Sequence, residues 1–166
     1  PCILRPGGVT RAMLEKVVGE VTVAGSVLRP LKTGEKALSP GMRYRHYSPD
    51  GQVTLVEGSE KEVVEALAAL YHDAERAGHQ ACVMCFTEHV AVLKECRPHD
   101  IGSREHPEEV AYRLFDTLRR LDEEKMEAIF SEVVPPEGMG LAVMNRLGRA
   151  AAFRSVQAAD IVREKR

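Results

Sequence analysis

The chain has 166 residues, of which 44% are hydrophobic and 29% charged, values typical of a folded globular protein and not of a disordered tail. Its formal net charge is −2, so no overall basic field would draw it to nucleic acid or to an anionic membrane. No apolar run approaches the length of about 18 residues needed to cross a bilayer, and the first residues do not resemble a signal peptide, so we expect a cytoplasmic protein without membrane contact.

Residues 1–19 read as an extended apolar segment, a Pro-Gly-Gly turn and a short helix. Thr10 is suited to cap a helix from Arg11 to Val18, and Gly19 is suited to end it. Because a single strand is not stable by itself, we interpret this segment as the tail of another domain.

In residues 20–52 the apolar residues do not keep a helical or a strand periodicity over any long stretch. A structureless segment of this length is uncommon inside a compact domain, whereas a linker between two domains explains it. We therefore predict an interdomain linker over residues 20–52.

The linker contains the unusual stretch SPGMRYRHYSP, residues 39–49, which we call the linker motif. Its prolines and glycine favour an extended segment over a helix. In an extended chain Arg43, Arg45 and Tyr47 share one face, and Tyr44 and His46 share the other. Guanidinium groups and tyrosines together suit a phosphate attached to a flat ring. A solvated basic linker is the alternative that composition leaves open.

After Gly51, strand patterns alternate with helix patterns. Ser59-x-x-Glu62 reads as a capping box, and Pro107 is suited to the first position of a helix. The expected strands are 52–57, 82–86, 96–101 and 126–134, and the expected longer helices follow residues 59, 107 and 141. The alternation predicts an α/β fold: a three-layer, Rossmann-like domain with a mainly parallel sheet over residues 53–156, followed by a tail over 157–166.

Four features invite a functional interpretation that the sequence does not support. Cys82 and Cys85 have the spacing of a redox or zinc pair, but in a strand they face opposite sides, so we predict core residues. The six histidines show no metal-ligand spacing, and we predict no metal site. Gly138-x-Gly140 lacks the third glycine of a dinucleotide loop, which favours a tight turn. We interpret the nearby polar side chains as a polar helix face and not as catalytic groups, namely Asn145, Arg146 and Arg149.

The linker motif resembles the interdomain linker of two-domain threonylcarbamoyl-adenylate synthases, in which a YrdC-like catalytic domain precedes a smaller C-terminal domain. Arg43 and Ser48 stand where lysine and alanine are more usual. The segment LRPG around Arg5 is similar to the end of the catalytic domain, and LRRLD at 118–122 and the stretch 138–151 are similar to the C-terminal domain.

The resemblance implies that the intact protein condenses L-threonine, bicarbonate and ATP, accompanied by Mg²⁺, into threonylcarbamoyl-AMP and pyrophosphate. The product would feed the threonylcarbamoyladenosine modification of tRNA through a downstream threonylcarbamoyl transferase machinery. On this basis the linker is expected to act as a lid, and this portion alone is expected to be inactive, because the catalytic residues belong to the other domain. The residues expected to bind nucleotide are Arg5, Arg43, Tyr44, Arg45, His46 and Tyr47.

Two other functions remain open from the residues alone. One is a stand-alone Rossmann-like regulatory or binding module without catalysis. The other is an RNA-contacting module that uses the basic and aromatic residues of the linker motif. The balanced net charge argues against the second, so direct RNA binding is not expected.

Overall fold

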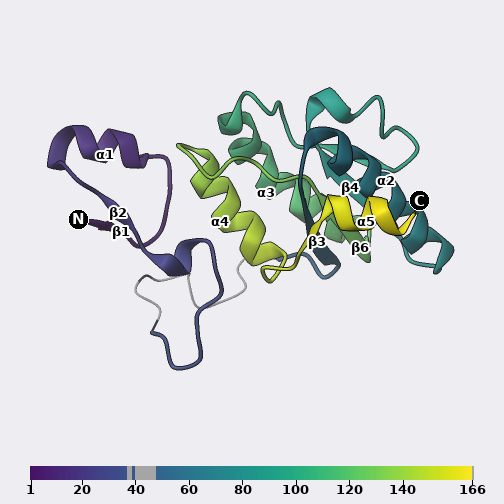
Figure 1. The fold of residues 1–166 in the computed structure, drawn as a ribbon, viewed down its shortest axis with the longest axis horizontal. Helices are drawn as coiled ribbons and strands as arrows, with labels where there is room; N and C mark the ends of the chain where they lie inside the picture. Colours follow the sequence, from purple (N-terminus) through teal and green to yellow (C-terminus); the bar gives the residue numbers. More distant parts are fainter. Residues whose placement is uncertain (37–38, 40–47, 166) are drawn as a thin grey trace.

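The computed structural model describes residues 1–36, 39 and 48–165. From Gln52 onward the chain forms a three-layer α/β domain built on a five-stranded sheet (Figure 1). All of its described strand pairs are parallel, and the strand order is β5-β4-β6-β3-β7. The strands are β3 (Gln52–Glu57), β4 (Ala81–Cys85), β5 (Pro98–Asp100), β6 (Ala128–Ser131) and β7 (Ser155–Gln157). The predicted fold class is therefore confirmed.

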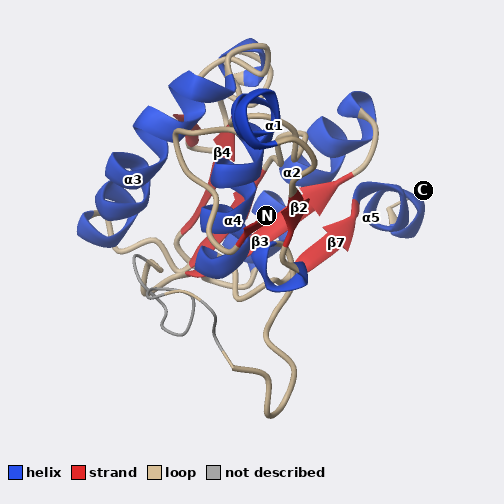
Figure 2. Cartoon of the chain, turned by 90° about the vertical axis from the view of Figure 1, so that its left-hand side faces the viewer, coloured by secondary structure: helices blue, strands red, loops and turns tan. Residues whose placement is uncertain are grey.

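Helices cover both faces of the sheet (Figure 2). On one face α3 (Pro107–Glu123) and α4 (Gly140–Ala150) enclose the larger hydrophobic core. On the other face α2 (Glu60–Arg76) and α5 (Ala158–Glu164) enclose a second core. A sheet that is buried on both faces explains why the central strand β4 is fully buried along its length.

The two cysteines of β4 show the alternation of strand side chains directly. Cys82 belongs to the core under α3 and α4, whereas Cys85 belongs to the core under α2 and α5. Both thiols are free, and burial raises the pKa of each to about 12. The prediction that these residues are core residues on opposite faces is confirmed.

The N-terminal segment forms a small unit of its own, drawn in purple in Figure 1. Its two strands, β1 (Cys2–Ile3) and β2 (Thr22–Val23), pair in parallel. Between them lies α1 (Arg11–Val18), whose N-cap Thr10 accepts a hydrogen bond from the backbone amide of Met13, as expected. A 3-10 helix, η1 (Gly25–Val27), follows β2, so the predicted linker begins with a strand and a helical turn.

Several predicted elements differ from the observed ones. Residues 157–166 were expected to form a tail, but Gln157 completes β7 and α5 buries Ala158 against the core, because an apolar stripe on α5 packs on α2. A short 3-10 helix, η2 (Thr87–His89), follows β4. The Ser59 hydroxyl bonds the Glu62 carboxylate at 2.5 Å and caps no backbone amide, so the predicted capping box does not form.

Within the described residues, no helix is both long and apolar enough to span a bilayer.

Candidate functional site

Of the six residues predicted to bind nucleotide, the structure describes only Arg5. The other five, Arg43, Tyr44, Arg45, His46 and Tyr47, lie outside the described residues. Arg5 follows β1 in an exposed turn, and no ion pair or side-chain hydrogen bond with another described residue involves it. Its guanidinium group is therefore available to an external anion.

Arg5 lines a cavity of about 880 Å³, which we call the N-terminal cavity. Most of its wall is apolar, and Arg5 carries the only charged side chain among its described lining residues. Ser39, the first residue of the linker motif, lines the same cavity. The start of the linker motif and the predicted nucleotide-binding arginine therefore line one cavity, although the two are far apart in sequence. The residues of the wall include Ile3, Leu4, Val9, Leu14, Val18 and Val21.

Helix α1, which borders this cavity, has no buried residue. Its apolar side chains are largely exposed, as are those just before it: Val9 (61%), Met13 (54%), Val17 (82%) and Val18 (51%). A continuous apolar face of this kind usually marks a contact surface.

Both ends of the segment that carries the linker motif are fixed to α4. At the first end Asn145 donates from Nδ2 to the Val27 carbonyl at 2.6 Å, and Arg149 donates from Nη2 to the Ser26 carbonyl at 3.1 Å. At the other end the Ser48 hydroxyl donates to the Arg149 carbonyl at 3.3 Å. The chain is therefore bonded to α4 on both sides of residues 28–47, at Ser26 and Val27 and again at Ser48. We call this set of bonds the linker clamp.

The clamp corrects the interpretation of the polar residues of α4. Arg146 is exposed, whereas Asn145 is buried and Arg149 is half-buried, so two of the three polar side chains bond the linker. Burial lowers the pKa of Arg149, whose guanidinium group also lies 5.7 Å from the centre of the Phe153 ring. The sequence gives no sign of this role, because the acceptors are backbone carbonyls more than 100 positions earlier.

A second cavity, of about 290 Å³, lies at the carboxyl ends of the parallel strands, and we call it the sheet-edge cavity. It is lined by Val56–Gly58 at the end of β3, by Phe86 after β4, by Val133–Pro136 after β6, and by Glu60, Val63, Arg104 and Glu132. The turn before α4 closes one side. Gly140 lies so close to Pro135 that a Cβ atom at this position would come within 2.0 Å of the Pro135 carbonyl oxygen. Gly138-x-Gly140 is thus a close-packed turn, as predicted.

A buried His–Glu pair forms the back of this cavity. Nδ1 of His89 lies 2.9 Å from both carboxylate oxygens of Glu132, and Nε2 lies 2.9 Å from Oε1 of Glu60. Glu132 also accepts a hydrogen bond from the Phe86 amide at 2.7 Å. Burial by itself would lower the pKa of His89, but the bonds to Glu132 and Glu60 outweigh it and raise this pKa above its ordinary value. Spacing in the sequence could not reveal the pair, because it joins residues 43 positions apart.

Arg104 closes the mouth of the cavity by pairing with Oε2 of Glu60 at 3.0 Å. Within the described part of the chain, no group of three histidine, cysteine or acidic residues could hold a metal ion. The sheet-edge cavity therefore has a partly apolar wall, charged residues of which Arg104 and Glu60 pair with each other, and no metal-ligand set among the described residues.

Taken together, these features define a C-terminal α/β domain with a clamped N-terminal linker and a small strand-and-helix unit before it. A family model described as threonylcarbamoyl-AMP synthase, C-terminal domain, matches residues 9–152. The chain belongs to this family.

Two relatives are similar over nearly the whole chain. A threonylcarbamoyl-AMP synthase of Bacillus subtilis is 36% identical over 157 residues, which are 95% of this chain and 43% of the relative. One of Pyrococcus abyssi is 33% identical over 161 residues, 95% of this chain and 44% of the relative. The chain thus spans a little under half the length of these relatives.

Solved structures support the same relationship. The P. abyssi protein called Sua5, solved with L-threonine, has a TM-score of 0.82 at 33% identity, over 95% of this chain and 44% of that one. A variant of it, in which an adjacent histidine and tyrosine are both replaced by alanine, gives the same TM-score. A separate C-terminal Sua5 domain from Pyrococcus horikoshii covers 66% of this chain with a TM-score of 0.50.

Proposed function

We propose that this chain is the linker and C-terminal portion of an enzyme that makes threonylcarbamoyl-AMP and pyrophosphate from L-threonine, bicarbonate and ATP for tRNA modification. Family membership supports the proposal, and so does the L-threonine complex of the P. abyssi protein. The observation that carries it is the N-terminal cavity, where Arg5 and the first residue of the linker motif meet.

Arg5 is proposed to bind a phosphate of ATP. A guanidinium group presents paired donors that match phosphate oxygens, and it stays charged at all physiological pH values. Because Arg5 is exposed and has no ion-pair partner among the described residues, it requires no rearrangement to do so. Magnesium would enter with the ATP phosphates, and we assign no residue of this chain to it.

The linker motif is proposed to close over the bound nucleotide, with Arg43 and Arg45 toward phosphates and Tyr44, His46 and Tyr47 toward the base or ribose. The linker clamp supports this role, since it fixes both ends of residues 28–47 and leaves the motif between them. The double variant of the P. abyssi protein is relevant as well, because His46-Tyr47 is the only His-Tyr pair in this sequence.

A lid of this kind suits the chemistry. In the proposed reaction the threonine amine and bicarbonate give a carbamate and release water, and the carbamate oxygen then attacks the α-phosphorus of ATP while the bond to pyrophosphate breaks. The mixed carbamic–phosphoric anhydride is labile in water, so a site that excludes water protects it. The catalytic groups are assigned to the other domain, and the threonylcarbamoyl transferase machinery would consume the product.

The proposal is tested in the full-length enzyme by threonine-dependent pyrophosphate release. Arg45→Ala and Tyr47→Ala are each expected to lower kcat/KM for ATP by about tenfold or more, the effect of losing one hydrogen bond to a charged group. Lys36→Ala, at an exposed position of the linker outside the motif, serves as the control and is expected to stay within about twofold.

Unchanged rates in both motif variants would remove the lid. If the isolated chain instead bound tRNA with a steep salt dependence, the RNA-contacting alternative would replace the proposal.

A further inference from the structure

The sheet-edge cavity occupies the topological switch point of the sheet. Strands β4 and β6 are neighbours, but β4 continues toward β5 at one edge, whereas β6 continues through α4 toward β7 at the opposite edge. The β4–β5 connection packs on the face covered by α2, and α4 lies on the other face (Figure 2). Connections that diverge in this way leave a crevice at the carboxyl ends of the strands, where open α/β sheets bind ligands.

The size and wall of the cavity limit what it can hold. A volume of about 290 Å³ lies at the lower end of the range for ligand sites, so only a small molecule fits. The inner wall is apolar, and its members include Val56, Val63, Phe86 and Val134, all of them buried. A ligand therefore needs a short apolar body.

The charges of the lining favour a cation. Three glutamates and one arginine line the cavity, and His89 lies behind Glu132. Both positive groups already have carboxylate partners, since Arg104 pairs with Glu60 and His89 lies between Glu60 and Glu132.

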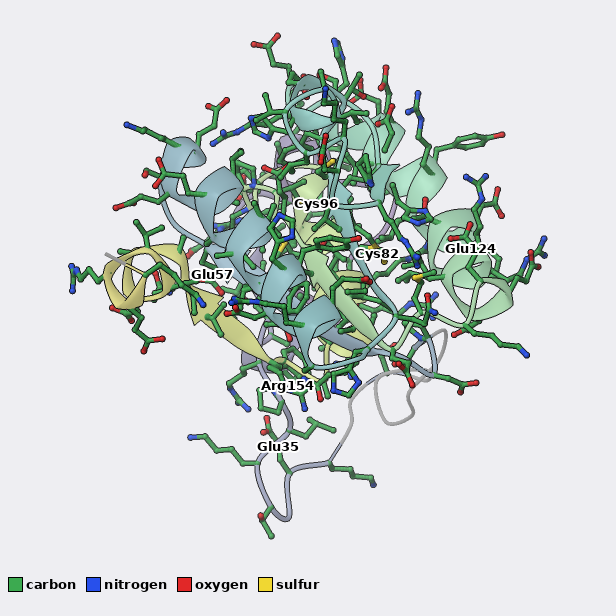
Figure 3. All side chains as sticks on the ribbon, turned by 90° about the vertical axis from the view of Figure 1, so that its right-hand side faces the viewer. Glu35, Glu57, Cys82, Cys96, Glu124 and Arg154 are labelled. Carbon is green, nitrogen blue, oxygen red and sulfur yellow. The ribbon has the colours of Figure 1, made fainter. Side chains whose placement is uncertain are left out.

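Glu57 differs from the other two glutamates. It is half-buried at the end of β3, between α2 and the β7–α5 segment, as Figure 3 shows. No ion pair or side-chain hydrogen bond with another described residue involves its carboxylate. An unpaired carboxylate beside an apolar wall attracts an opposite charge more strongly than one in open water does.

We propose that the sheet-edge cavity is a binding site for a small organic ammonium ion, with the cationic nitrogen at Glu57 and the apolar body against Val63 and Phe86. The described lining offers no metal-ligand set, so an organic cation is a better match than a metal ion. The site stands on the geometry of the α/β domain alone and does not depend on the proposed synthase activity.

The test is an NMR titration of the full 166-residue chain, labelled with ¹⁵N, with two probes of matched shape. Butylammonium carries the proposed charge, and butyrate carries the opposite one. Butylammonium at millimolar concentrations is expected to shift the amide signals of Gly58, Thr87 and Val134, while butyrate leaves them in place. Absence of shifts with butylammonium, or equal shifts with both probes, would overturn the proposal.

A charge-removing variant tests the assigned residue. Glu57→Gln keeps the shape of the side chain and is expected to weaken butylammonium binding about three- to tenfold, the effect of losing one partly screened charge contact. Glu123→Gln, on the exposed side of α3, is the matched control and is expected to bind as the unmodified chain does. Equal affinity in the Glu57 variant would reject Glu57 as the anchor.

Discussion

The side-chain amide of Asn145 donates a 2.6 Å hydrogen bond to the backbone carbonyl of Val27, 118 positions earlier in the chain. Both residues are buried, and Val27 packs with Leu141 in a small apolar cluster between η1 and α4. A buried carbonyl needs a partner, and here one side chain of the C-terminal domain supplies it. The bond therefore fixes the point at which the linker leaves that domain.

Replacing Asn145 by alanine is expected to destabilise the chain by about 1–3 kcal/mol, because the Val27 carbonyl stays buried without its donor. Urea unfolding followed by circular dichroism measures the difference. In native conditions, trypsin should also cut faster after Lys32 and Lys36, since the clamp no longer holds this end of the linker.

The matched control is Arg146→Ala, one position further along the same helix and exposed. Its effect is expected to stay within about 0.5 kcal/mol. Equal losses in the two variants would mean that the clamp contributes nothing specific.

A second prediction concerns the turn that closes the sheet-edge cavity. Gly140→Ala would normally favour a helix, because alanine has the higher helix propensity. Here the added Cβ would lie 2.0 Å from the Pro135 carbonyl oxygen, so the backbone must shift. We expect a loss of at least about 2 kcal/mol in the free energy of unfolding, by the cost of overpacking.

Gly8→Ala is the control, since a Cβ there has no heavy atom within 4 Å. Thermal unfolding of the two variants compares them directly. A stabilised Gly140→Ala chain would show that the turn is not tightly packed.

The sequence allowed the fold class to be predicted, because alternating strand and helix patterns leave few topologies. It also located α1, α2 and α3 nearly to the residue, since Thr10 and Pro107 mark helix starts clearly. It missed β7 and α5, because three residues carry too little periodicity to identify a strand that is defined only by its pairing with β3.

The candidate sites were predicted less completely. Arg5 and the linker motif were identified by the resemblance of their sequences to a known family, and not by helical or strand periodicity. The linker clamp and the His89–Glu132 pair depend on contacts between distant segments, which no local pattern encodes. Asn145 was therefore predicted only as part of a polar helix face, although its buried side-chain amide bonds the linker.

A third prediction follows from the raised pKa of His89. When the pKa of a group is higher in the folded state than in the unfolded state, protonation of the group stabilises the fold. For histidine this contribution is complete below the unfolded-state pKa, near 6.5, and it is lost as the pH rises through the folded-state pKa. The stability difference between the unmodified chain and His89→Gln should therefore be largest below about pH 6.5, at about 2–3 kcal/mol, and should shrink at higher pH. Groups that face His89 are Glu132 and Glu60, and Arg104 and Glu88 lie next to them.

Urea unfolding between pH 5.5 and 9 provides the measurement. The control is His72→Gln, at an exposed position of α2, which is expected to change stability little at any pH. A difference for His89→Gln that grows with pH would contradict the assignment of a protonated His89 between two carboxylates.

The last prediction concerns the apolar face of α1, where the side chain of Val17 is exposed. Val17→Lys should change the stability of this 166-residue chain by no more than about 0.5 kcal/mol, because the residue is exposed and lysine suits the C-terminal turn of a helix. We expect the proposed catalytic domain to cover this face in the full-length enzyme, where the same change would then bury an unpaired ammonium group and cost several kcal/mol. Thermal unfolding of both forms, with Lys16→Ala as the control on the neighbouring exposed position, separates the two cases. Equal tolerance in the full-length enzyme would mean that α1 keeps its apolar face exposed there and contacts a different partner.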